Sequence, residues 1–415
     1  MSCSEWQKVR LGDVIEFNPK ETIKKKQISK KVSMDKLDTF TRKINGYEEV
    51  EFTSGTKFRN GDTLLARITP CLENGKTAQV DILDDGEVAF GSTEFIVLRE
   101  KKGKTINDYI YYLSISPLFR NIAIKCMTGT SGRQRVQKDV LEDTEILLPP
   151  LEEQEKIADI LSSLDDRIEL NNEMNKTLEE MAQSIFKRWF VDFEFPNEDG
   201  QPYKSSGGEM VESEQGMIPK GWEVKKISEL IEVKDGTHAS PKVSKEGYPL
   251  VTSKHIKGDS IAIDDAKLIS EKDYIEVNKR SKVDTGDILI SMIGTVGLTY
   301  LVQEDNINFA IKNIGLFKTS QNTMLSEYIY LYIKSPNMKS YIESRLAGTT
   351  QKYISLGELR NIPIVLPTDN VISRFKDVSR VLLDKKRSNI LENEDIKNIR
   401  NSLLPKLMIG EIKFN

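Results

Sequence analysis

The chain has 415 residues, of which 38% are hydrophobic and 30% are charged, so it can build two or three globular domains. Its formal net charge of −4, taken alone, argues against a nucleic-acid binder. Cys3, Cys71 and Cys126 follow no metal or disulfide spacing, which fits a reducing cytoplasm. We find no signal peptide, and the longest uncharged run, residues 288–302, is too short to span a bilayer. The sequence therefore predicts a cytoplasmic protein with no membrane partner.

Charge is unevenly spread along the chain. Residues 20–43 carry nine basic and three acidic side chains, a local balance of +6. Residues 192–214 carry seven acidic side chains and one lysine, a balance of −6. A basic run is most often a solvated face, but this one also permits a nucleic-acid surface in the first part of the chain.

The first segment, residues 1–148, contains short apolar runs separated by turn residues, a pattern that predicts strands. Runs of this kind occur at 61–68 and 90–98, and a short helix is expected at 107–113. A Gly/Thr/Ser-rich loop, 128–132, follows. We name this segment head one and expect it to form a mixed α/β domain.

Residues 149–191 should form one long helix. Apolar and small side chains recur at alternating four- and three-residue spacing from Ile157 to Trp189, and Asn171 and Asn175 occupy the middle positions. This repeat places one stripe along a helix, as in a coiled coil. The stripe is roughly 48 Å long at about 1.5 Å per residue, so it needs a partner helix.

Residues 192–220 are rich in Gly and Pro and poor in apolar side chains, so we expect a linker without a core of its own. Residues 221–367, named head two, then repeat head one at an offset near 220. Trp222 corresponds to Trp6, residues 286–290 to 61–65, and Gln351 to Gln134 with a short gap. The repeat predicts a second domain of the same fold.

Residues 368–415 should form the second long helix and a tail. The same spacing runs from Val371 to Leu403, with Lys385, Asn389 and Glu392 in its middle, and Pro405 is expected to end the helix.

The two stripes have equal length and polar centres, which favours an antiparallel pair. Buried polar groups at such positions would fix the register of the two helices. The alternative is two independent amphipathic helices, each lying on its own domain. The fold class is therefore α+β: two repeated α/β domains separated by two long antiparallel spacer helices with pseudo-two-fold symmetry. The expected pairs are Ile157 with Leu403, Asn171 with Asn389, and Asn175 with Lys385.

Catalytic motifs are absent from the sequence. We find no glycine-rich phosphate or methyl-donor loop, and His238 and His255 have no zinc-binding spacing. Asp62 and Asp287 follow glycine at equivalent positions before apolar strands, where an aspartate is far more often a turn residue than a catalytic one. The sequence therefore predicts no catalytic residue, no metal and no bound cofactor.

Candidate DNA contacts lie in predicted loops, where binding residues usually occur. Arg pairs with guanine, Asn and Gln pair with adenine, and Lys more often contacts phosphate. For each residue alone, a solvated side chain is the alternative. The candidates are Lys24, Lys25, Lys26, Arg67, Lys76, Arg133, Gln134 and Arg135 in head one, and His238, Lys254, His255, Lys312, Asn313, Gln351 and Lys352 in head two.

Several motifs together resemble the specificity subunits of type I restriction-modification systems, over nearly the whole chain. They are Trp222 with residues 227–231, the strand 286–290, the Gly-Thr-Thr-Gln351 loop, residues 147–154 entering the first helix, and the ending 403–412. Residues 368–371, Thr-Asp-Asn-Val, depart from the Pro-Leu-Glu-Glu-Gln that begins the first helix.

The resemblance implies that each head is a target recognition domain for one half of a split, asymmetric DNA site. The helices would set the gap between half-sites and dock two modification (methyltransferase) subunits, which restriction subunits then join in defence against foreign DNA. Methyl transfer to adenine, with S-adenosylmethionine, would belong to the partners. The alternatives are a self-contained DNA methyltransferase or nuclease, and a coiled-coil scaffold that binds proteins only.

Overall fold

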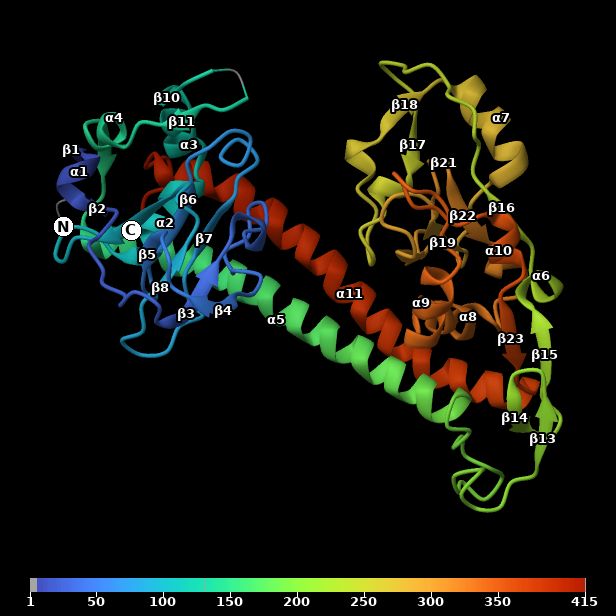
Figure 1. The fold of residues 1–415 in the computed structure, drawn as a ribbon. Coiled ribbons are helices and arrows are strands. Elements are labelled where there is room, and N and C mark those ends of the chain that lie inside the picture. Colours follow the sequence, from blue (N-terminus) through green and yellow to red (C-terminus); the bar gives the residue numbers. More distant parts are fainter. Residues whose placement is uncertain (1–5, 131, 415) are drawn as a thin grey trace. The chain divides into compact units, whose positions relative to one another are not determined.

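The computed structural model describes residues 6–130 and 132–414, so Cys3 lies outside the described residues. The chain divides into two compact units, one formed by residues 1–173 with 389–415 and the other by residues 174–388. The boundaries fall inside the two long helices, α5 (Leu151–Phe190) and α11 (Asp369–Met408), so each unit holds one head and part of both helices. Figure 1 labels the elements of each unit.

Head one contains two four-stranded sheets, which are built from short strands. The first sheet has the order β2-β9-β6-β7, and β6 (Thr63–Ala66) lies in it with all four residues buried. The second has the order β4-β3-β8-β5, in which β3 (Ile28–Val32) and β8 (Ala89–Gly91) are parallel. The other strands of these sheets are β2 (Ile15–Phe17), β4 (Glu48–Glu51), β5 (Thr56–Phe58), β7 (Thr77–Gln79) and β9 (Phe95–Glu100).

Helices cover the first sheet of head one. α2 (Asn107–Ile115) begins where the short helix was predicted and buries Tyr109 and Tyr111 completely. α3 (Pro117–Lys125) begins at Pro117 because proline suits the first turn, and Ser116 caps it by accepting the backbone N–H of Phe119. The remaining elements are β1 (Gln7–Arg10), α1 (Leu11–Val14), β10 (Met127–Thr128), β11 (Arg135–Val136), α4 (Lys138–Glu142) and β12 (Glu145–Leu148).

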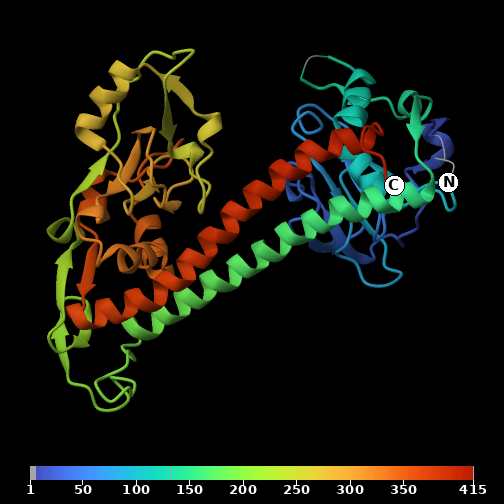
Figure 2. The same cartoon turned by 180° about the vertical axis from the view of Figure 1, so that it is seen from behind.

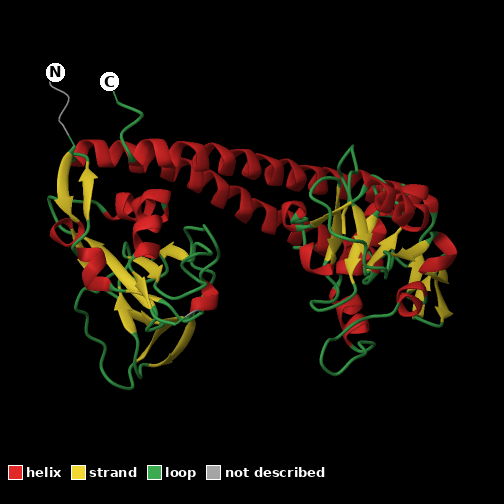
Figure 3. Ribbon diagram, turned by 90° about the horizontal axis from the view of Figure 1, so that it is seen from above, coloured by secondary structure: helices red, strands yellow, loops and turns green. Residues whose placement is uncertain are grey.

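Head two, like head one, combines short strands with short helices (Figure 3). It follows a similar order of elements, as the sequence repeat predicted, although its second sheet has three strands instead of four. Its first sheet has the order β16-β22-β19-β20, and its second has the order β18-β17-β21, in which β17 (Tyr248–Thr252) and β21 (Ala310–Lys312) are parallel. The other elements are β15 (Glu223–Lys226), α6 (Ile227–Leu230), β16 (Val233–Asp235), β18 (Lys267–Ile269), α7 (Glu271–Ser281), β19 (Ile288–Ser291), β20 (Thr299–Leu301), β22 (Ile314–Phe317), α8 (Ser326–Lys334), α9 (Pro336–Glu343), α10 (Leu356–Arg360) and β23 (Pro363–Leu366).

The two predicted turn aspartates hold the same buried ion pair in each head. Asp62 is fully buried and accepts two hydrogen bonds from Arg99, at 2.6 and 2.7 Å. Asp287 is also fully buried and accepts from Lys318 at 2.5 Å. Each carboxylate also accepts a backbone N–H three residues before it. These contacts account for both aspartates as structural turn residues at the entry to β6 and β19.

Within the first unit, the start of α5 packs against the end of α11 in antiparallel orientation (Figure 2). Asp165 accepts from Arg400 at 2.5 Å and from Tyr112 at 2.9 Å, while Asn171 donates to Asn393 at 3.0 Å. Contacts from later residues of α5 therefore reach earlier residues of α11, as expected for antiparallel helices. The predicted Asn171–Asn389 pairing is wrong by about one turn, because the charged pair Asp165–Arg400 lies in the interface and shifts the register.

Within the second unit, the end of α5 packs against the start of α11 through Phe186, Phe190 and Phe375. Lys386 is 5% exposed and contacts Glu179 at 2.7 Å. The prediction that Lys385 lies in the seam is therefore wrong, since Lys385 is exposed and its neighbour is buried. The alternating four- and three-residue spacing counted Val378 as an apolar position of the stripe, but Val378 is 42% exposed. In this part of α11 the predicted stripe therefore lies one residue away from the buried face. Asn171, Asn175 and Asn389 are buried as predicted.

Two further expectations about helix ends and the linker are corrected. Pro405 lies inside the last turn of α11, which continues to Met408. The segment 192–220 is not without a core, because Phe195 stacks between Tyr203 and Trp222 with ring centroids at 4.5 and 5.0 Å. The same segment forms a hairpin from β13 (Met210–Ser213) and β14 (Gly216–Pro219). A few aromatic side chains are enough to fold it against head two.

Candidate nucleic-acid interface

Each head has a cavity at the end of its parallel strand pair. In head two the strands β17 and β21 end at Thr252 and Lys312, which lie opposite each other, and the cavity lies just beyond them. In head one the strands β3 and β8 end at Val32 and Gly91, which also lie opposite each other. The two cavities have volumes of about 530 and 540 Å³. The two cavities therefore share the ends of the parallel strands, but the rest of the head-two lining comes from the loops around Gly294 and Gln351, whereas the rest of the head-one lining comes from residues 50–54.

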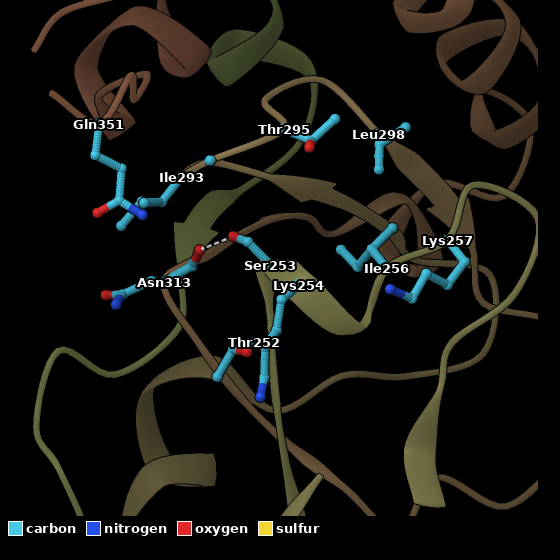
Figure 4. Close-up of a pocket in the computed structure, with 11 residues that line it drawn as sticks. Thr252, Ser253, Lys254, Ile256, Lys257, Ile293, Thr295, Leu298, Asn313 and Gln351 are labelled. Atoms are coloured by element: carbon cyan, nitrogen blue, oxygen red, sulfur yellow. Dashed lines mark hydrogen bonds between the residues drawn. The ribbon is translucent and has the colours of Figure 1, made fainter. Parts of the chain in front are cut away.

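The head-two cavity brings together three predicted DNA contacts from distant parts of the sequence, namely Lys254, Asn313 and Gln351. Figure 4 shows the carboxamides of Asn313 and Gln351 on the same side of the cavity, with Lys254 on the 3-10 turn after β17 and Lys257 just beyond that turn. Lys254, Lys257 and Gln351 are exposed. The lining therefore combines cations suited to phosphate with amides suited to base edges.

Hydrogen bonds fix the position of Asn313 at both backbone and side chain. Its backbone has φ of 53°, a left-handed conformation that asparagine tolerates better than most residues. Its carbonyl oxygen accepts the Ser253 hydroxyl at 2.7 Å, as drawn in Figure 4. Its side chain contacts His238 Nδ1 at 2.8 Å, and His238 Nε2 contacts Asp235 at 2.8 Å. Arg280 in turn pairs with Asp235, so four side chains form one connected row.

Gln351 and Lys352 are held by a tight loop rather than by a plain turn. Ala347 and Tyr353 exchange backbone hydrogen bonds of 2.9 Å, which close the loop. Gly348 has φ of +90°, and a Cβ there would lie 2.3 Å from the carbonyl oxygen of Gln351. Lys352 accepts the backbone N–H of Gly294 at 3.1 Å. Both side chains are exposed on this fixed loop.

The other two head-two candidates differ in their availability. His255 was predicted as a DNA contact, and this is wrong: it is 3% exposed, and its Nδ1 accepts the backbone N–H of Thr252 at 2.9 Å. Burial, with a smaller contribution from the adjacent Lys254, lowers the pKa of His255, so the neutral ring is favoured. The sequence could not separate His255 from its exposed neighbour. Lys312 is half-buried and donates to Ser240 at 2.6 Å.

Three head-one candidates are engaged in holding the fold. Arg67 donates to the carbonyl oxygen of Val136 at 2.9 Å, and Lys76 donates to that of Met34 at 2.9 Å. Arg135 forms a salt bridge with Glu94 at 2.8 Å. The hydrogen bond from Arg135 lowers the pKa of Glu94 against the opposing effect of burial, so the carboxylate stays charged and the pair persists.

The remaining head-one candidates are accessible. Lys24, Lys25, Lys26 and Arg133 are exposed, and Gln134 is partly exposed. The three lysines form a turn in which Lys26 has φ of 67° and donates its backbone N–H to Phe52 at 3.2 Å. This turn is therefore anchored at the end of β4, next to residues that line the head-one cavity.

Sequence reasoning missed the lining of the head-one cavity. Its polar residues carry hydroxyls, one ammonium and one carboxylate, and none of them belongs to the predicted set. Knowledge that β3 and β8 are parallel neighbours would have identified Ser33 and Ser92, because each follows the end of one strand. The polar lining residues are Lys31, Ser33, Glu51, Thr53, Ser54, Ser92 and Thr93.

The structure also corrects the alignment of the two glycine-containing loops. Thr69 donates to the carbonyl oxygen of Gln134, and at the equivalent place Gly294 donates to that of Lys352. Gln134 therefore corresponds to Lys352, and Arg133 corresponds to Gln351. The predicted match of the two glutamines was wrong because the gap in the loop lies before Arg133. Ser131, within the head-one loop, lies outside the described residues.

Among the residues that the structure describes, no group of three or more His, Cys, Asp or Glu side chains is placed to hold a metal ion. Over the same residues, no helix combines the length and the apolar character needed to cross a bilayer.

Comparison with known proteins gives a consistent result. A family model described as the type I restriction modification DNA specificity domain matches residues 3–180 and 219–400. The HindI specificity subunit of Haemophilus influenzae is 27% identical over 481 aligned positions, covering 99% of this chain and 100% of that protein. The MjaIX specificity subunit of Methanocaldococcus jannaschii is 28% identical over 323 positions, covering 75% of this chain and 70% of that protein.

A solved structure shares the fold. The crystal structure of a type I restriction-modification system S subunit from M. genitalium has a TM-score of 0.53 at 15% identity, and the match covers 99% of this chain and 97% of that one. The family match covers both heads and most of both long helices. The chain therefore belongs to the family of type I restriction-modification DNA specificity domains and carries two copies of that domain.

Proposed function

We propose that this protein is the specificity subunit of a type I restriction-modification complex and that each head binds one half of a bipartite DNA site. The observation that carries the proposal is that each head has a cavity at the ends of its parallel strands and that the two polar linings differ. Two similar domains with unlike contact residues suit two unlike half-sites. The family match over both heads supports the same assignment.

Charge at the two cavities supports a duplex as the ligand despite the net charge of −4. Lys254 and Lys257 stand at the head-two cavity, and Lys31 lines the head-one cavity. Phosphate contacts of this kind orient a protein on the duplex, and base-edge contacts then supply sequence preference. The amides and hydroxyls in the linings are groups of the second kind.

In this proposal the chain itself is not catalytic. Two modification subunits, bound through the long helices, would transfer the methyl group from S-adenosylmethionine to adenine, and restriction subunits would supply cleavage. The relatives compared above are named as specificity subunits of type I restriction enzymes, which supports this division. Asp62 and Asp287, the carboxylates that most resembled catalytic candidates, are fully buried in ion pairs and are not accessible to a substrate.

The test is binding to a library of random DNA duplexes, followed by sequencing of the bound fraction, for the full chain co-purified with modification subunits. We expect enrichment of one bipartite sequence, and we expect log K to fall linearly with log salt concentration. Lys352→Ala should reduce that salt slope by about 1, whereas Lys385→Ala, on the exposed face of α11, should leave it unchanged. Binding without sequence enrichment, or methyl transfer by the isolated chain, would reject the proposal.

A further inference from the structure

We infer that the head-two cavity binds the major-groove edge of an adenine, contacted by the carboxamide of Asn313, and that Asp235 and His238 are positioning residues for that carboxamide. The inference deepens the proposed function and rests on it, since it names one base and the residue that selects it.

The chemistry of the lining favours adenine over the other bases. Adenine offers the N6 amino group as a donor and N7 as an acceptor in the major groove, and a carboxamide offers the matching acceptor and donor. The cavity contains two carboxamides, Asn313 and Gln351, and its described lining contains no carboxylate that would accept the N4 amino group of cytosine. Its two cations, Lys254 and Lys257, lie on flexible exposed side chains, which suit phosphate better than a fixed base edge.

The row of hydrogen bonds determines which face of the Asn313 carboxamide is available. Asp235 is 4% exposed and pairs with Arg280, so its carboxylate accepts from His238 Nε2. The Asn313 atom 2.8 Å from His238 Nδ1 is the side-chain oxygen Oδ1, which as an amide oxygen can only accept the hydrogen bond. This orientation leaves the second lone pair of Oδ1 and the amide N–H groups directed away from His238, as an acceptor and a donor side by side.

The backbone of Asn313 is fixed as well, so little freedom is lost when a base binds. The Ser253 hydroxyl donates to the Asn313 carbonyl oxygen at 2.7 Å and accepts the backbone N–H of Met292 at 3.2 Å. Ser253 is 8% exposed, so this link is protected from water. A contact group held at both backbone and side chain discriminates bases better than a mobile one, because fewer rotamers remain to be ordered.

Head one provides an internal comparison for this site. Strand register places Ser92 where head two has Asn313, because each residue directly follows the end of the second parallel strand. Ser92 accepts the backbone N–H of Glu94 at 3.1 Å and has no carboxamide to present. The inference therefore assigns adenine selection at this place to the second half-site alone.

The experiment uses the full chain with its modification subunits and a library of duplexes in which each position of the recognised site is randomised. Asn313→Gly keeps the left-handed backbone available and removes the carboxamide. Loss of a bidentate contact is worth about 1–3 kcal/mol, so preference for adenine at one position of the second half-site should fall by about 5- to 150-fold. Asn313→Asp keeps an acceptor but removes the donor, and should shift the preferred base at that position from adenine toward cytosine.

His238 is tested as a positioning residue through the same profile. His238→Ala should weaken the preference for adenine at that one position by about 3- to 10-fold, and His238→Gln, which retains a hydrogen-bonding group, should restore part of it. Melting temperature should be unchanged for these variants, which separates positioning from folding. Asn337→Ala, on the exposed surface of α9 in the same head, is the matched control and should change no position.

The outcomes separate this inference from the function on which it rests. Wild-type protein that selects no sequence would reject the proposed function. Wild-type protein that selects a bipartite site, with Asn313→Gly leaving every position unchanged or weakening all positions equally, would overturn the inference and leave the function intact. A change confined to the first half-site would also overturn it.

Discussion

Head one and head two share a frame but not a contact surface. In both, a buried aspartate at the entry to a strand pairs with a cation from the neighbouring strand or from just after it, Asp62 with Arg99 on β9 and Asp287 with Lys318 after β22. At the ends of the parallel strands, by contrast, head one has Ser92 where head two has Asn313, and in the glycine-containing loop head one has Arg133 where head two has Gln351. The repeated residues therefore build the fold, whereas residues that differ between the heads lie where a ligand would bind.

The parts of the helix pair that belong to each unit show a similar contrast. In the first unit Asp165 and Arg400 form a buried ion pair, and the Tyr112 hydroxyl donates a hydrogen bond to Asp165. In the second unit Lys386 contacts both Glu179 and Asp259 at 2.7 Å, and Asp259 belongs to head two. Both arrangements connect a head to the helices through charges, but they use unrelated residues. Buried charges of this kind fix register at some expense of stability.

Exchange of a whole head should have the largest effect. We expect replacement of residues 1–148 by the matching head of a relative to change one half-site completely and to leave the other unchanged. The reason is that head one has its own sheets, its own cavity and a core cluster formed by residues 32–97 alone. Mapping of methylated adenines, with modification subunits present, measures both half-sites at once. The reciprocal exchange of residues 221–367 is the control, and changes in both half-sites from either exchange would contradict separate recognition.

The second prediction concerns the charged cluster of the second unit. Lys386→Met removes one cation and leaves Glu179 and Asp259 with Lys334 alone. We expect the free energy of unfolding of this unit to fall by about 1 kcal/mol, because Lys334 still pairs with both carboxylates and solvent reaches Asp259, whose side chain is 41% exposed. Urea denaturation followed by tryptophan fluorescence measures it, because two of the three tryptophans, Trp189 and Trp222, lie in this unit.

The adjacent lysine is a matched control for this prediction. Lys385→Met makes the same chemical change one residue earlier on an exposed face, and should alter stability by no more than about 0.5 kcal/mol. Equal changes in unfolding free energy from the two variants would show that the charged cluster does not stabilise the unit.

A smaller effect should appear in acid. Burial alone would raise the pKa of Glu179, but Lys334 and Lys386 together lower it, and the pKa of Asp259 is lowered in the same way. A carboxyl group whose pKa is lowered on folding stabilises the folded state above its unfolded pKa of about 4, and this stabilisation is lost as pH falls through the folded value. The difference in unfolding free energy between wild type and Lys386→Met should therefore shrink below about pH 4. Urea denaturation at pH 7, 5 and 3 tests this, and a difference independent of pH would contradict it.

Much of the fold was predictable from the sequence because it rests on repetition. The offset near 220 identified the equivalent strands, as β6 and β19 show, and the apolar spacing identified both long helices. The register of the helix pair was not predictable in the same way. Spacing rules count apolar residues, whereas Lys386 and Arg400 enter the interface as charges paired with residues far away in the sequence.

The candidate site was only partly predictable, for a related reason. Residue type and loop position identified Lys254, Asn313 and Gln351, which the fold brings to one cavity. They could not identify Ser92, since serine carries no signal of its own until its strand is known to end beside β3. They also could not exclude His255, because burial of its ring depends on how residues distant in the sequence pack around it.

The ends of the chain repeat the connection between α5 and head two. At the end of α5, Asp192 donates its backbone N–H to Lys187, and at the end of α11, Glu411 donates to Lys406 at the same separation, both at 2.9 Å. Trp222 then packs on Phe195, and in the first unit a Cβ added at Gly410 would lie 3.3 Å from the indole of Trp6. The first residues after α11 therefore resemble the first residues after α5, although the segment after α5 continues into the hairpin of β13 and β14.

This resemblance predicts the smallest effect of all. Joining Phe414 to Trp6 through a short Gly/Ser linker and opening the chain near Gly207 should leave a folded protein with nearly unchanged stability and the same half-sites. Gly207 is exposed in a turn, although Gly208 beside it packs on Tyr203, so opening between the exposed Glu214 and Gln215 should disturb even less. Exposed turns tolerate such openings because few buried contacts depend on them. A chain opened between the fully buried residues of β9 is the control and should not fold. Melting temperature and methylation mapping with the modification subunits measure the outcome, and loss of folding in both turn-opened chains would contradict the resemblance of the two connections.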